Sequence, residues 1–251
     1  MPAMTLLASA RFTTTVAQMR QLPNDGLPEV AFAGRSNAGK SSALNVLCNR
    51  RRLAFASRMP GRTQALNFFA IGPQDQPNGF LVDMPGYGYA TAPGAVRDSW
   101  VGLAGDYLRT RQPLVAVVLM LDIRRGVTAL DHGLLAWTPN TIPVLGLLTK
   151  ADKLGRNQQQ AALRAVRAEL SLRHPSRPFD LVLFSSTHRI GLEEASDRIA
   201  AFYRLTQDLD SAPAIDTGGA QPAPPERPPT DPSRDFPTSP TDPATQHEFP
   251  R

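Results

Sequence analysis

The sequence predicts an α/β fold of three layers, in which helices cover both faces of a mostly parallel, six-stranded sheet. Short apolar, β-branched or aromatic runs of strand length alternate with longer segments of helical periodicity. A strand followed by a helix usually returns to a parallel neighbour. Two strand-like runs, 65–71 and 79–83, are separated only by the turn-rich segment 72–78, which favours a hairpin. One antiparallel edge strand should therefore border the sheet.

The individual elements follow from these patterns. The predicted strands are apolar runs bounded by polar or turn-forming residues: Glu29–Ala33, Ala65–Ile71, Gly79–Asp83, Leu114–Asp122, Pro143–Thr149 and Phe179–Ser185. The predicted helices follow most of these strands: Lys40–Cys48, Val96–Thr110, Thr128–Trp137, Asn157–Leu172 and Gly191–Leu205. No internal repeat interrupts this alternation, so one domain accounts for all of them.

Composition divides the chain of 251 residues into three parts. Residues 206–251 hold eleven of the 24 prolines, few large apolar residues and no periodicity. Such a segment cannot bury enough surface to offset the entropy of ordering it. We therefore expect a Pro-rich, acidic, disordered tail over residues 206–251, a globular domain over residues 27–205 and a lead-in segment over residues 1–26.

The charge is unevenly distributed. Residues 1–205 carry 24 Lys and Arg against 14 Asp and Glu, a net charge of +10. A surface this basic attracts polyanions such as nucleic acid; the alternative is an ordinary solubilising surface in an arginine-rich chain. Cys48 is the only cysteine, which excludes an internal disulfide and a Cys-rich metal site. Because no stretch approaches 18 uninterrupted apolar residues and no signal-peptide pattern is present, we expect a cytoplasmic protein without a membrane partner.

Residues 34–41, Gly-Arg-Ser-Asn-Ala-Gly-Lys-Ser, match the phosphate-binding pattern G-x-x-x-x-G-K-[ST] between a predicted strand and a predicted helix. Glycines let backbone N–H groups approach phosphate oxygens, and the helix N-terminus adds favourable partial charge. Lys40 should reach the β- and γ-phosphates, and Ser41 should place its hydroxyl on Mg²⁺. Up to this point, an ATP-using enzyme such as a small-molecule kinase is an alternative.

The segment 83–86, Asp-Met-Pro-Gly, ends the second hairpin strand beside the phosphate loop. The pattern D-x-x-G is weak alone, since residues 152–155 also fit it, but only the first copy lies at the sheet edge where ligands collect. Asp83 should hold Mg²⁺ through water, and the Gly86 N–H should contact the γ-phosphate and order the residues that follow. Tyr87 stands where Ras-type enzymes have a water-orienting glutamine, so we expect slow intrinsic hydrolysis that needs help in trans.

The segment 49–64 lacks periodicity and lies where a first switch loop belongs. Within it, Thr63 is the candidate for a second hydroxyl ligand of Mg²⁺, made only when the γ-phosphate is present. The alternative is that Thr63 merely begins the next strand. Asn37 resembles the asparagine that helps some GTPases to seat a monovalent cation, which makes activation by K⁺ a further hypothesis.

The segment 149–152, Thr-Lys-Ala-Asp, follows an apolar strand and fits the pattern [NT]-K-x-D. Guanine offers N1–H and N2–H₂ side by side, and a carboxylate accepts two such hydrogen bonds, whereas adenine has an acceptor at N1 and no amino group at C2. Asp152 should therefore select guanine, while Lys150 lies along the purine face and Thr149 braces the loop. Ser185, Ser186 and Thr187 close the next strand, where a backbone N–H can donate to guanine O6.

Several of these stretches resemble the EngB (YihA/YsxC) family of bacterial GTPases. They are Gly-Arg-Ser-Asn-Ala-Gly-Lys-Ser-Ser at 34–42, Pro-Gly-Arg-Thr-Gln at 60–64, Leu-Asn-Phe-Phe at 66–69, Val-Asp-Met-Pro-Gly-Tyr-Gly-Tyr-Ala at 82–90 and Thr-Lys-Ala-Asp at 149–152. The similarity spans roughly Arg11 to Leu205. It implies a monomeric, Ras-like P-loop GTPase that binds GTP and GDP and acts in late assembly of the large ribosomal subunit, with rRNA and ribosomal proteins as partners. The family is also linked to normal cell division and septation; a nucleotide-dependent RNA-binding adaptor with negligible hydrolysis is the alternative.

Motifs and resemblance together give one set of site residues. The predicted catalytic residues are Lys40, Thr63 and Gly86, and the predicted ligands of Mg²⁺ are Ser41, Thr63 and Asp83. The predicted nucleotide-binding residues are Gly34, Arg35, Ser36, Asn37, Ala38, Gly39, Lys40, Ser41, Ser42, Gly61, Arg62, Thr63, Gln64, Ala65, Asp83, Met84, Pro85, Gly86, Thr149, Lys150, Ala151, Asp152, Ser185, Ser186 and Thr187.

Overall fold

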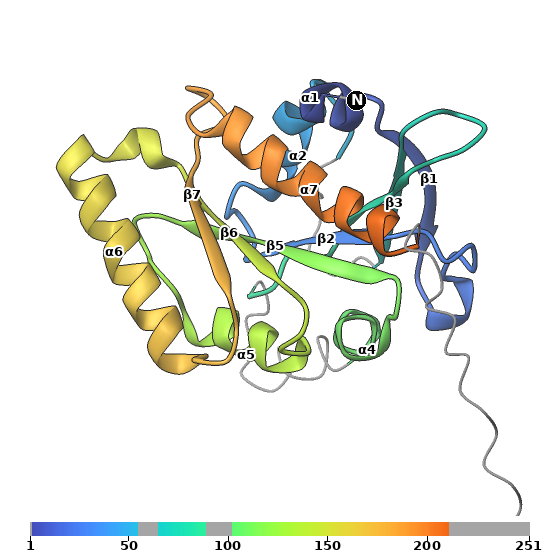
Figure 1. The fold of residues 1–251 in the computed structure, drawn as a ribbon. Helices are drawn as coiled ribbons and strands as arrows, with labels where there is room; N and C mark the ends of the chain where they lie inside the picture. The colour runs from blue at the N-terminus through green and yellow to red at the C-terminus, as the bar shows by residue number, and fades with distance from the viewer. Residues whose placement is uncertain (1, 55–64, 89–101, 211–251) are drawn as a thin grey trace, which may run out of the picture. The chain divides into compact units, whose positions relative to one another are not determined.

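The computed structural model describes residues 2–54, 65–88 and 102–210 (Figure 1). In this part of the chain, seven strands form one sheet in the order β1-β3-β4-β2-β5-β6-β7. The strands are β1 (Arg11–Val16), β2 (Glu29–Gly34), β3 (Leu66–Ile71), β4 (Gly79–Asp83), β5 (Leu114–Asp122), β6 (Val144–Thr149) and β7 (Phe179–Leu183). The helices are α1 (Ala3–Ala8), α2 (Lys40–Leu47), α4 (Leu103–Thr110), α5 (Ala129–Trp137), α6 (Arg156–Arg173) and α7 (Leu192–Asp210), with short 3₁₀ turns η1 (Met19–Gln21) and η2 (Ala151–Lys153).

The predicted α/β class and the predicted hairpin are both confirmed. β3 and β4 pair antiparallel, with Asn67 opposite Asp83, whereas β4, β2, β5, β6 and β7 pair parallel in succession. The described sheet has seven strands where six were predicted, because β1 pairs antiparallel along β3 and takes the edge position. β3 therefore runs against its neighbours from inside the sheet and does not form its border.

β1 lies in the segment predicted as a lead-in, because its sequence lacks the pattern of a half-buried strand. Thr13, Thr14 and Thr15 are β-branched and suit a strand, but they are polar, so the run lacks the apolar alternation of a half-buried strand. Val16 is fully buried, whereas Phe12 is 59% exposed. An edge strand with one solvated face tolerates this composition, so tertiary pairing with β3 decided its structure.

Several helix boundaries differ from their predictions. Thr128 caps α5 and does not belong to the helix: its backbone N–H and its hydroxyl donate to Asp131 Oδ2 at 2.7 and 2.6 Å, the arrangement of a capping box. α7 continues to Asp210, beyond the predicted domain end at residue 205. The first part of the predicted helix Val96–Thr110 lies outside the described residues.

Each face of the sheet carries its own apolar core. α1, α2 and α7 pack on one face and α4, α5 and α6 on the other, as the layers of Figure 1 show. β2 contributes to both, since Val30 and Phe32 point into the first core and Ala31 and Ala33 into the second. Because both faces are covered, the carboxyl edge of the parallel strands is the place left for a ligand.

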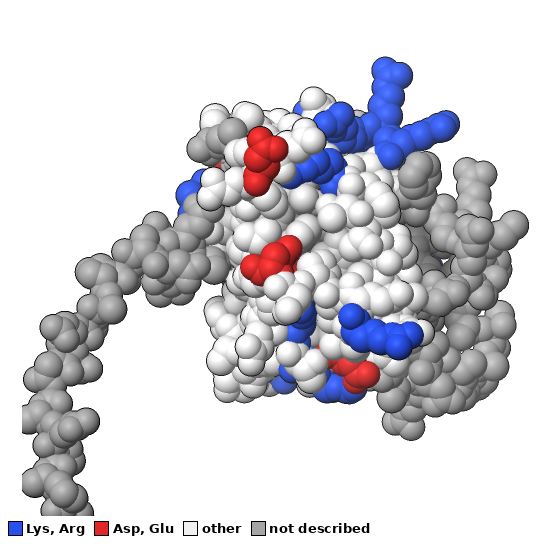
Figure 2. All heavy atoms as spheres, turned by 90° about the vertical axis from the view of Figure 1, so that its right-hand side faces the viewer, with Lys and Arg blue, Asp and Glu red and all other residues white. Residues whose placement is uncertain are grey.

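Two further observations concern the exterior of the molecule. None of the helices in the described ranges is long and apolar enough to cross a membrane. Figure 2 views the molecule from the β1 side and shows basic side chains gathered along the upper margin of that face. Acidic side chains also lie on this face, so the figure shows a basic margin and not a uniformly basic surface.

Candidate functional site

The predicted motifs meet at the carboxyl edge of the parallel strands. The register of β2 and β4 sets Phe32 beside Asp83, and the register of β5 and β6 sets Asp122 beside Thr149. The phosphate loop leaves β2 at Gly34 and leads into α2. Segments more than one hundred residues apart in sequence therefore end at one edge, where ligands bind in open α/β sheets.

The phosphate loop owes its shape to two left-handed residues. Asn37 has φ 66° and Gly39 has φ 93°, conformations that glycine adopts freely and asparagine tolerates. α2 begins directly afterwards at Lys40, and its N-cap, Gly39, supplies no side-chain hydrogen bond to the first turn. The backbone N–H groups of that turn therefore keep the donor capacity that suits an anionic ligand.

The structure brings Lys40 and Asp83 into contact: Lys40 Nζ donates to Asp83 Oδ1. The two side chains are only 11% and 6% exposed. The pair joins the phosphate loop to the end of β4, so a phosphate at Lys40 and a cation at Asp83 would lie next to each other. The Asp83 carboxylate and the Ser41 hydroxyl on α2 are hard oxygen donors that fit Mg²⁺. No cluster of three or more His, Cys, Asp or Glu residues able to hold a metal occurs among the described residues.

The loop after β4 packs against the phosphate loop. Ser36 N–H donates to Tyr87 O at 2.8 Å, and Tyr87 N–H donates to Gly34 O at 3.3 Å. A Cβ added at Gly86 would lie 3.3 Å from Ser36 Cα, closer than most real Cβ contacts. Gly86 therefore permits an approach of the two loops that a larger residue would hinder.

Tyr87 occupies the position of the absent glutamine, and its side chain is committed elsewhere. The ring is only 3% exposed, and its hydroxyl donates to Asp131 Oδ1 of α5. Burial raises the pKa of Tyr87 well above its ordinary value, and the charge and hydrogen bond of Asp131 raise it further. The phenol thus remains a protonated donor and is unsuited to act as a general base on water.

The base-binding motif is tied to the phosphate loop by two side chains. Thr149 Oγ1 donates to Ala38 O at 2.6 Å and lies 3.1 Å from Leu121 O. Lys150 Nζ donates to Asn37 O at 2.7 Å and to Asp122 Oδ2 at 2.9 Å. Lys150 itself has φ 60°. Phosphate and base ends of the site are therefore held in a fixed relation by hydrogen bonds between them.

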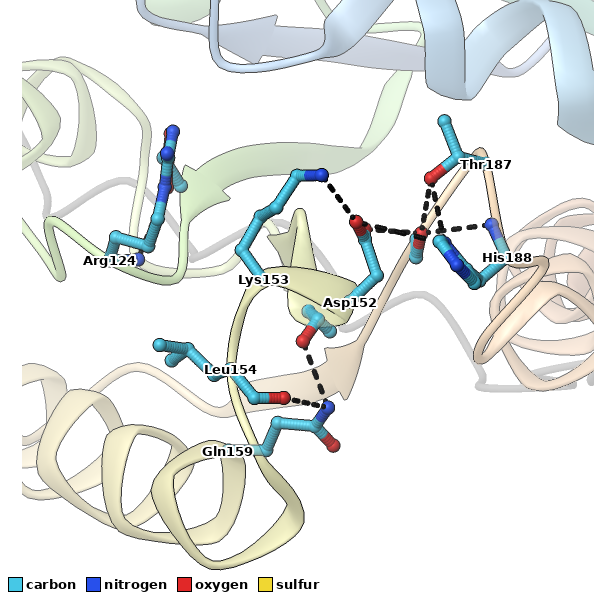
Figure 3. A network of polar contacts seen from close by, with 10 residues as sticks. Arg124, Asp152, Lys153, Leu154, Gln159, Thr187 and His188 are labelled. Atoms are coloured by element: carbon cyan, nitrogen blue, oxygen red, sulfur yellow. Dashed lines mark hydrogen bonds and ion pairs between the residues drawn. The ribbon is translucent and has the colours of Figure 1, made fainter.

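Asp152 is oriented by the turn that follows β7. Ser185 Oγ donates to Asp152 Oδ1 at 2.6 Å, and this hydrogen bond lowers the pKa of Asp152. Lys153 Nζ lies 3.2 Å from the buried Oδ2, which accepts no hydrogen bond in the described part of the chain. Figure 3 shows Asp152 between Lys153 and the turn that carries Thr187 and His188. An ionised carboxylate with acceptor capacity is the group that guanine N1–H and N2–H₂ require.

Asp122 and Arg124 belong to the site although no motif singled them out. Arg124 donates to Asp122 from Nε at 2.9 Å and from Nη2 at 2.7 Å, while Lys150 reaches the same carboxylate. Burial alone would raise the pKa of Asp122, but the hydrogen bonds from Arg124 and Lys150 outweigh it and hold the pKa well below its usual range. The signal in the sequence was an acidic residue ending an apolar strand, two positions before an arginine.

The remaining predicted residues include backbone anchors and residues outside the described ranges. Met84 N–H donates to Phe32 O at 3.0 Å, and Ala151 N–H donates to Phe184 O at 3.0 Å, so both anchor their loops through the backbone. Ala65 directly precedes β3. Four predicted residues lie outside the described ranges: Gly61, Arg62, Thr63 and Gln64.

A phosphate loop joined by hydrogen bonds to a loop whose ionised aspartate matches guanine makes this domain a P-loop GTP-binding protein. A probable GTP-binding protein EngB of Ralstonia pickettii (strain 12J) is 47% identical over 228 residues, 88% of this chain and 98% of the relative. The chain belongs to the EngB family of GTP-binding proteins, and it is therefore a GTPase.

Other comparisons agree with this family. A probable EngB of Paraburkholderia phymatum is 50% identical over 201 residues, 78% of this chain and 91% of the relative. Residues 29–150 match the family described as 50S ribosome-binding GTPase. The crystal structure of a probable GTP-binding protein EngB covers 70% of this chain and 99% of that protein, with a TM-score of 0.50 and 22% identity. The structure of elongation factor SelB of Methanococcus maripaludis matches 75% of this chain and 35% of that protein, with a TM-score of 0.52 and 16% identity. Both structural likenesses bear on the fold alone.

Proposed function

We propose that this GTPase is a slow, Mg²⁺-dependent switch in the assembly of the large ribosomal subunit, with a linked requirement for normal cell division and septation. The observation that carries the proposal is the match of residues 29–150 to a family described as ribosome-binding GTPases. The protein would act as a monomer in the cytoplasm, and its partners would be rRNA and ribosomal proteins.

The charge of the domain supports an RNA-rich partner. Residues 1–205 carry a net charge of +10, and basic side chains are displayed on the face seen in Figure 2. Binding through phosphate contacts releases counterions, so its affinity falls steeply as salt rises. A ribosomal partner should therefore be released by moderate salt.

The slow rate follows from the absence of a glutamine at position 87, where the Tyr87 hydroxyl donates to Asp131 and does not orient water. With no glutamine at this position to orient the attacking water, intrinsic hydrolysis lacks one part of the Ras-type machinery. A partner that stabilises the developing charge can accelerate such reactions by roughly 10³–10⁵-fold. The large subunit would supply that help, while Ser41 and Asp83, joined by Thr63 in the GTP state, would hold the Mg²⁺ that neutralises phosphate charge.

Activation by K⁺ is the second part of the proposal. Asn37 lies in the phosphate loop, and its carbonyl is fixed by Lys150 Nζ at 2.7 Å, which holds the residue in a defined position. We expect faster hydrolysis in K⁺ than in Na⁺ at equal ionic strength. Equal rates in the two buffers would remove K⁺ from the proposal.

Co-sedimentation with purified large subunits tests the ribosomal part. We expect binding to differ between GDP and a non-hydrolysable GTP analogue, and to weaken between low and moderate salt. Lys40→Ala is the matched control, because loss of the phosphate contact should make binding insensitive to the nucleotide. Wild-type binding that ignored both nucleotide and salt would contradict a switch on the ribosome.

Single-turnover hydrolysis with and without subunits separates the switch from the adaptor. A switch should hydrolyse GTP faster when subunits are added. Nucleotide-dependent binding without any acceleration, and with negligible hydrolysis throughout, would instead favour an RNA-binding adaptor.

A further inference from the structure

Tyr87 is held from two sides. Its backbone is joined to the phosphate loop, since Ser36 N–H donates to Tyr87 O at 2.8 Å and Tyr87 N–H donates to Gly34 O at 3.3 Å. Its side chain extends to α5, where the hydroxyl donates to Asp131 Oδ1. Gly86, which directly precedes Tyr87, is therefore fixed between the predicted phosphate loop and a helix on one face of the sheet.

Asp131 is well suited to anchor this segment. It is buried in the first turn of α5, and its two oxygens have separate partners. Oδ2 accepts from the N–H and hydroxyl of Thr128, which cap the helix, and Oδ1 accepts from Tyr87. Because Oδ2 is occupied by the cap, the carboxylate is oriented before it meets the phenol. Networks of this kind hold their members more firmly than single bonds do.

The bond is costly to break. Both groups are almost entirely buried, and a buried carboxylate oxygen that loses its donor bears the full penalty of desolvation. The phenol also stays protonated, because burial raises its pKa well above the ordinary value. The hydroxyl thus donates to Asp131 over the whole physiological range of pH.

We propose that Asp131 is a positioning residue for GTP hydrolysis, which fixes Gly86 beside the phosphate loop by binding the Tyr87 hydroxyl. The inference rests on the GTPase activity of the family and on the expected contact of the Gly86 N–H with the γ-phosphate. It does not depend on the ribosomal partner. Position 87, where other enzymes orient water, serves here to orient the backbone that receives the γ-phosphate.

Tyr87→Phe is the decisive variant, because it removes one oxygen and leaves the Thr128 cap on Asp131 intact. In the full chain without ribosomes, we expect affinity for a non-hydrolysable GTP analogue and the single-turnover rate to fall about tenfold, the loss expected for a hydrogen bond to a charged group. Affinity for GDP should stay within about twofold, since GDP has no γ-phosphate for Gly86 to contact.

Two further variants sharpen the test. Asp131→Ala, which removes both carboxylate oxygens, should produce at least the same loss, and adding Tyr87→Phe to it should cause little further loss, because the bond is already absent. Tyr203→Phe is the matched control: it removes another buried phenol hydroxyl, which donates to Phe80 O at 2.7 Å, and should leave hydrolysis unchanged.

A purely structural bond would behave differently. Tyr87→Phe would then lower the melting temperature while the ratio of GTP-analogue to GDP affinity and the hydrolysis rate stayed at wild-type values, and the proposal would be overturned. An increased rate would also overturn it, since the bond would then restrain Gly86 away from the γ-phosphate. If Asp131→Ala, which also loses the Thr128 cap, fails to fold, Tyr87→Phe alone decides.

Discussion

Strand β2 begins and ends beside a buried carboxylate that is paired with a basic side chain. At its start, Glu29 is fully buried and pairs with Arg111. At its carboxyl end, beside the phosphate loop, the Asp83 carboxylate pairs with Lys40. The two pairs share their chemistry but differ in what else surrounds each carboxylate.

Glu29 is satisfied from fixed elements. Tyr107 of α4 donates its hydroxyl to Glu29 Oε2 at 2.8 Å, and Arg111 Nε lies 3.0 and 3.1 Å from the two oxygens. Arg111 also donates to Pro23 O at 2.6 Å, which ties the segment before β2 to the end of α4. This network closes the amino edge of the sheet, so we infer that its role is stability.

The Lys40–Asp83 pair lies at the carboxyl end of β2, and each of its members has a predicted ligand of opposite charge. Lys40 is the predicted contact of a phosphate, and Asp83 is the predicted contact of Mg²⁺. A bound magnesium nucleotide therefore exchanges each partner for an equivalent charge. Both ends of β2 carry a buried charge. Only at the carboxyl end can the ion pair be replaced by a bound nucleotide and Mg²⁺, so only that end can take part in nucleotide binding and hydrolysis.

Breaking the Glu29–Arg111 pair should have the largest effect on the free energy of unfolding. Arg111→Ala leaves Glu29 buried without its cation, which typically costs about 3–5 kcal/mol of stability. Urea denaturation followed by circular dichroism measures the free energy of unfolding. The control is Arg198→Ala, whose exposed ion pair with Asp180 should contribute less than about 1 kcal/mol. Equal losses in the two variants would contradict a structural role for Arg111.

Breaking the Lys40–Asp83 pair should affect GTP hydrolysis more than stability. Lys40→Ala should lower the single-turnover rate at saturating GTP by about 10²–10³-fold, the range for removal of one charge-stabilising donor. It also leaves Asp83 without its cation, and added Mg²⁺ should restore part of the lost stability. No such rescue is expected for Arg111→Ala. If Mg²⁺ stabilised neither variant, the contrast between the two ends of β2 would fail.

The sequence predicts the strands and the motif loops far better than it predicts side-chain contacts between distant segments. The parallel strands and the motif loops are encoded locally, by apolar runs and by glycines or charged residues at fixed spacing. Contacts across the fold leave no such pattern. Arg111 lies 82 residues from Glu29, and Tyr87 lies 44 residues from Asp131, so neither pair can be recognised before the topology is known.

Three further features depend on contacts that no local sequence pattern reveals. β1 is polar because one face of an edge strand is solvated, so its pairing with β3 could not be read from alternation. His132 and His174 lie 42 residues apart in sequence, yet their rings stack at 5.2 Å and His132 Nδ1 lies 3.0 Å from His174 Nε2. The short 3₁₀ turns and the exact helix ends likewise depend on local capping by distant or neighbouring side chains, as Thr128 illustrates.

The smallest predicted effect concerns Tyr107, whose hydroxyl completes the hydrogen bonds around Glu29. Tyr107→Phe keeps the edge-to-face contact with Phe68, at 6.4 Å between ring centroids, and removes only the donor to Glu29. A hydrogen bond to a charged group contributes about 1.5–3 kcal/mol, so the free energy of unfolding should fall by that amount. Tyr203→Phe, which loses a donor to the neutral Phe80 carbonyl, should cost only about 1 kcal/mol. A smaller loss for Tyr107→Phe than for Tyr203→Phe would mean that Arg111 alone satisfies Glu29, and the amino edge would then be held by one ion pair and not by a network.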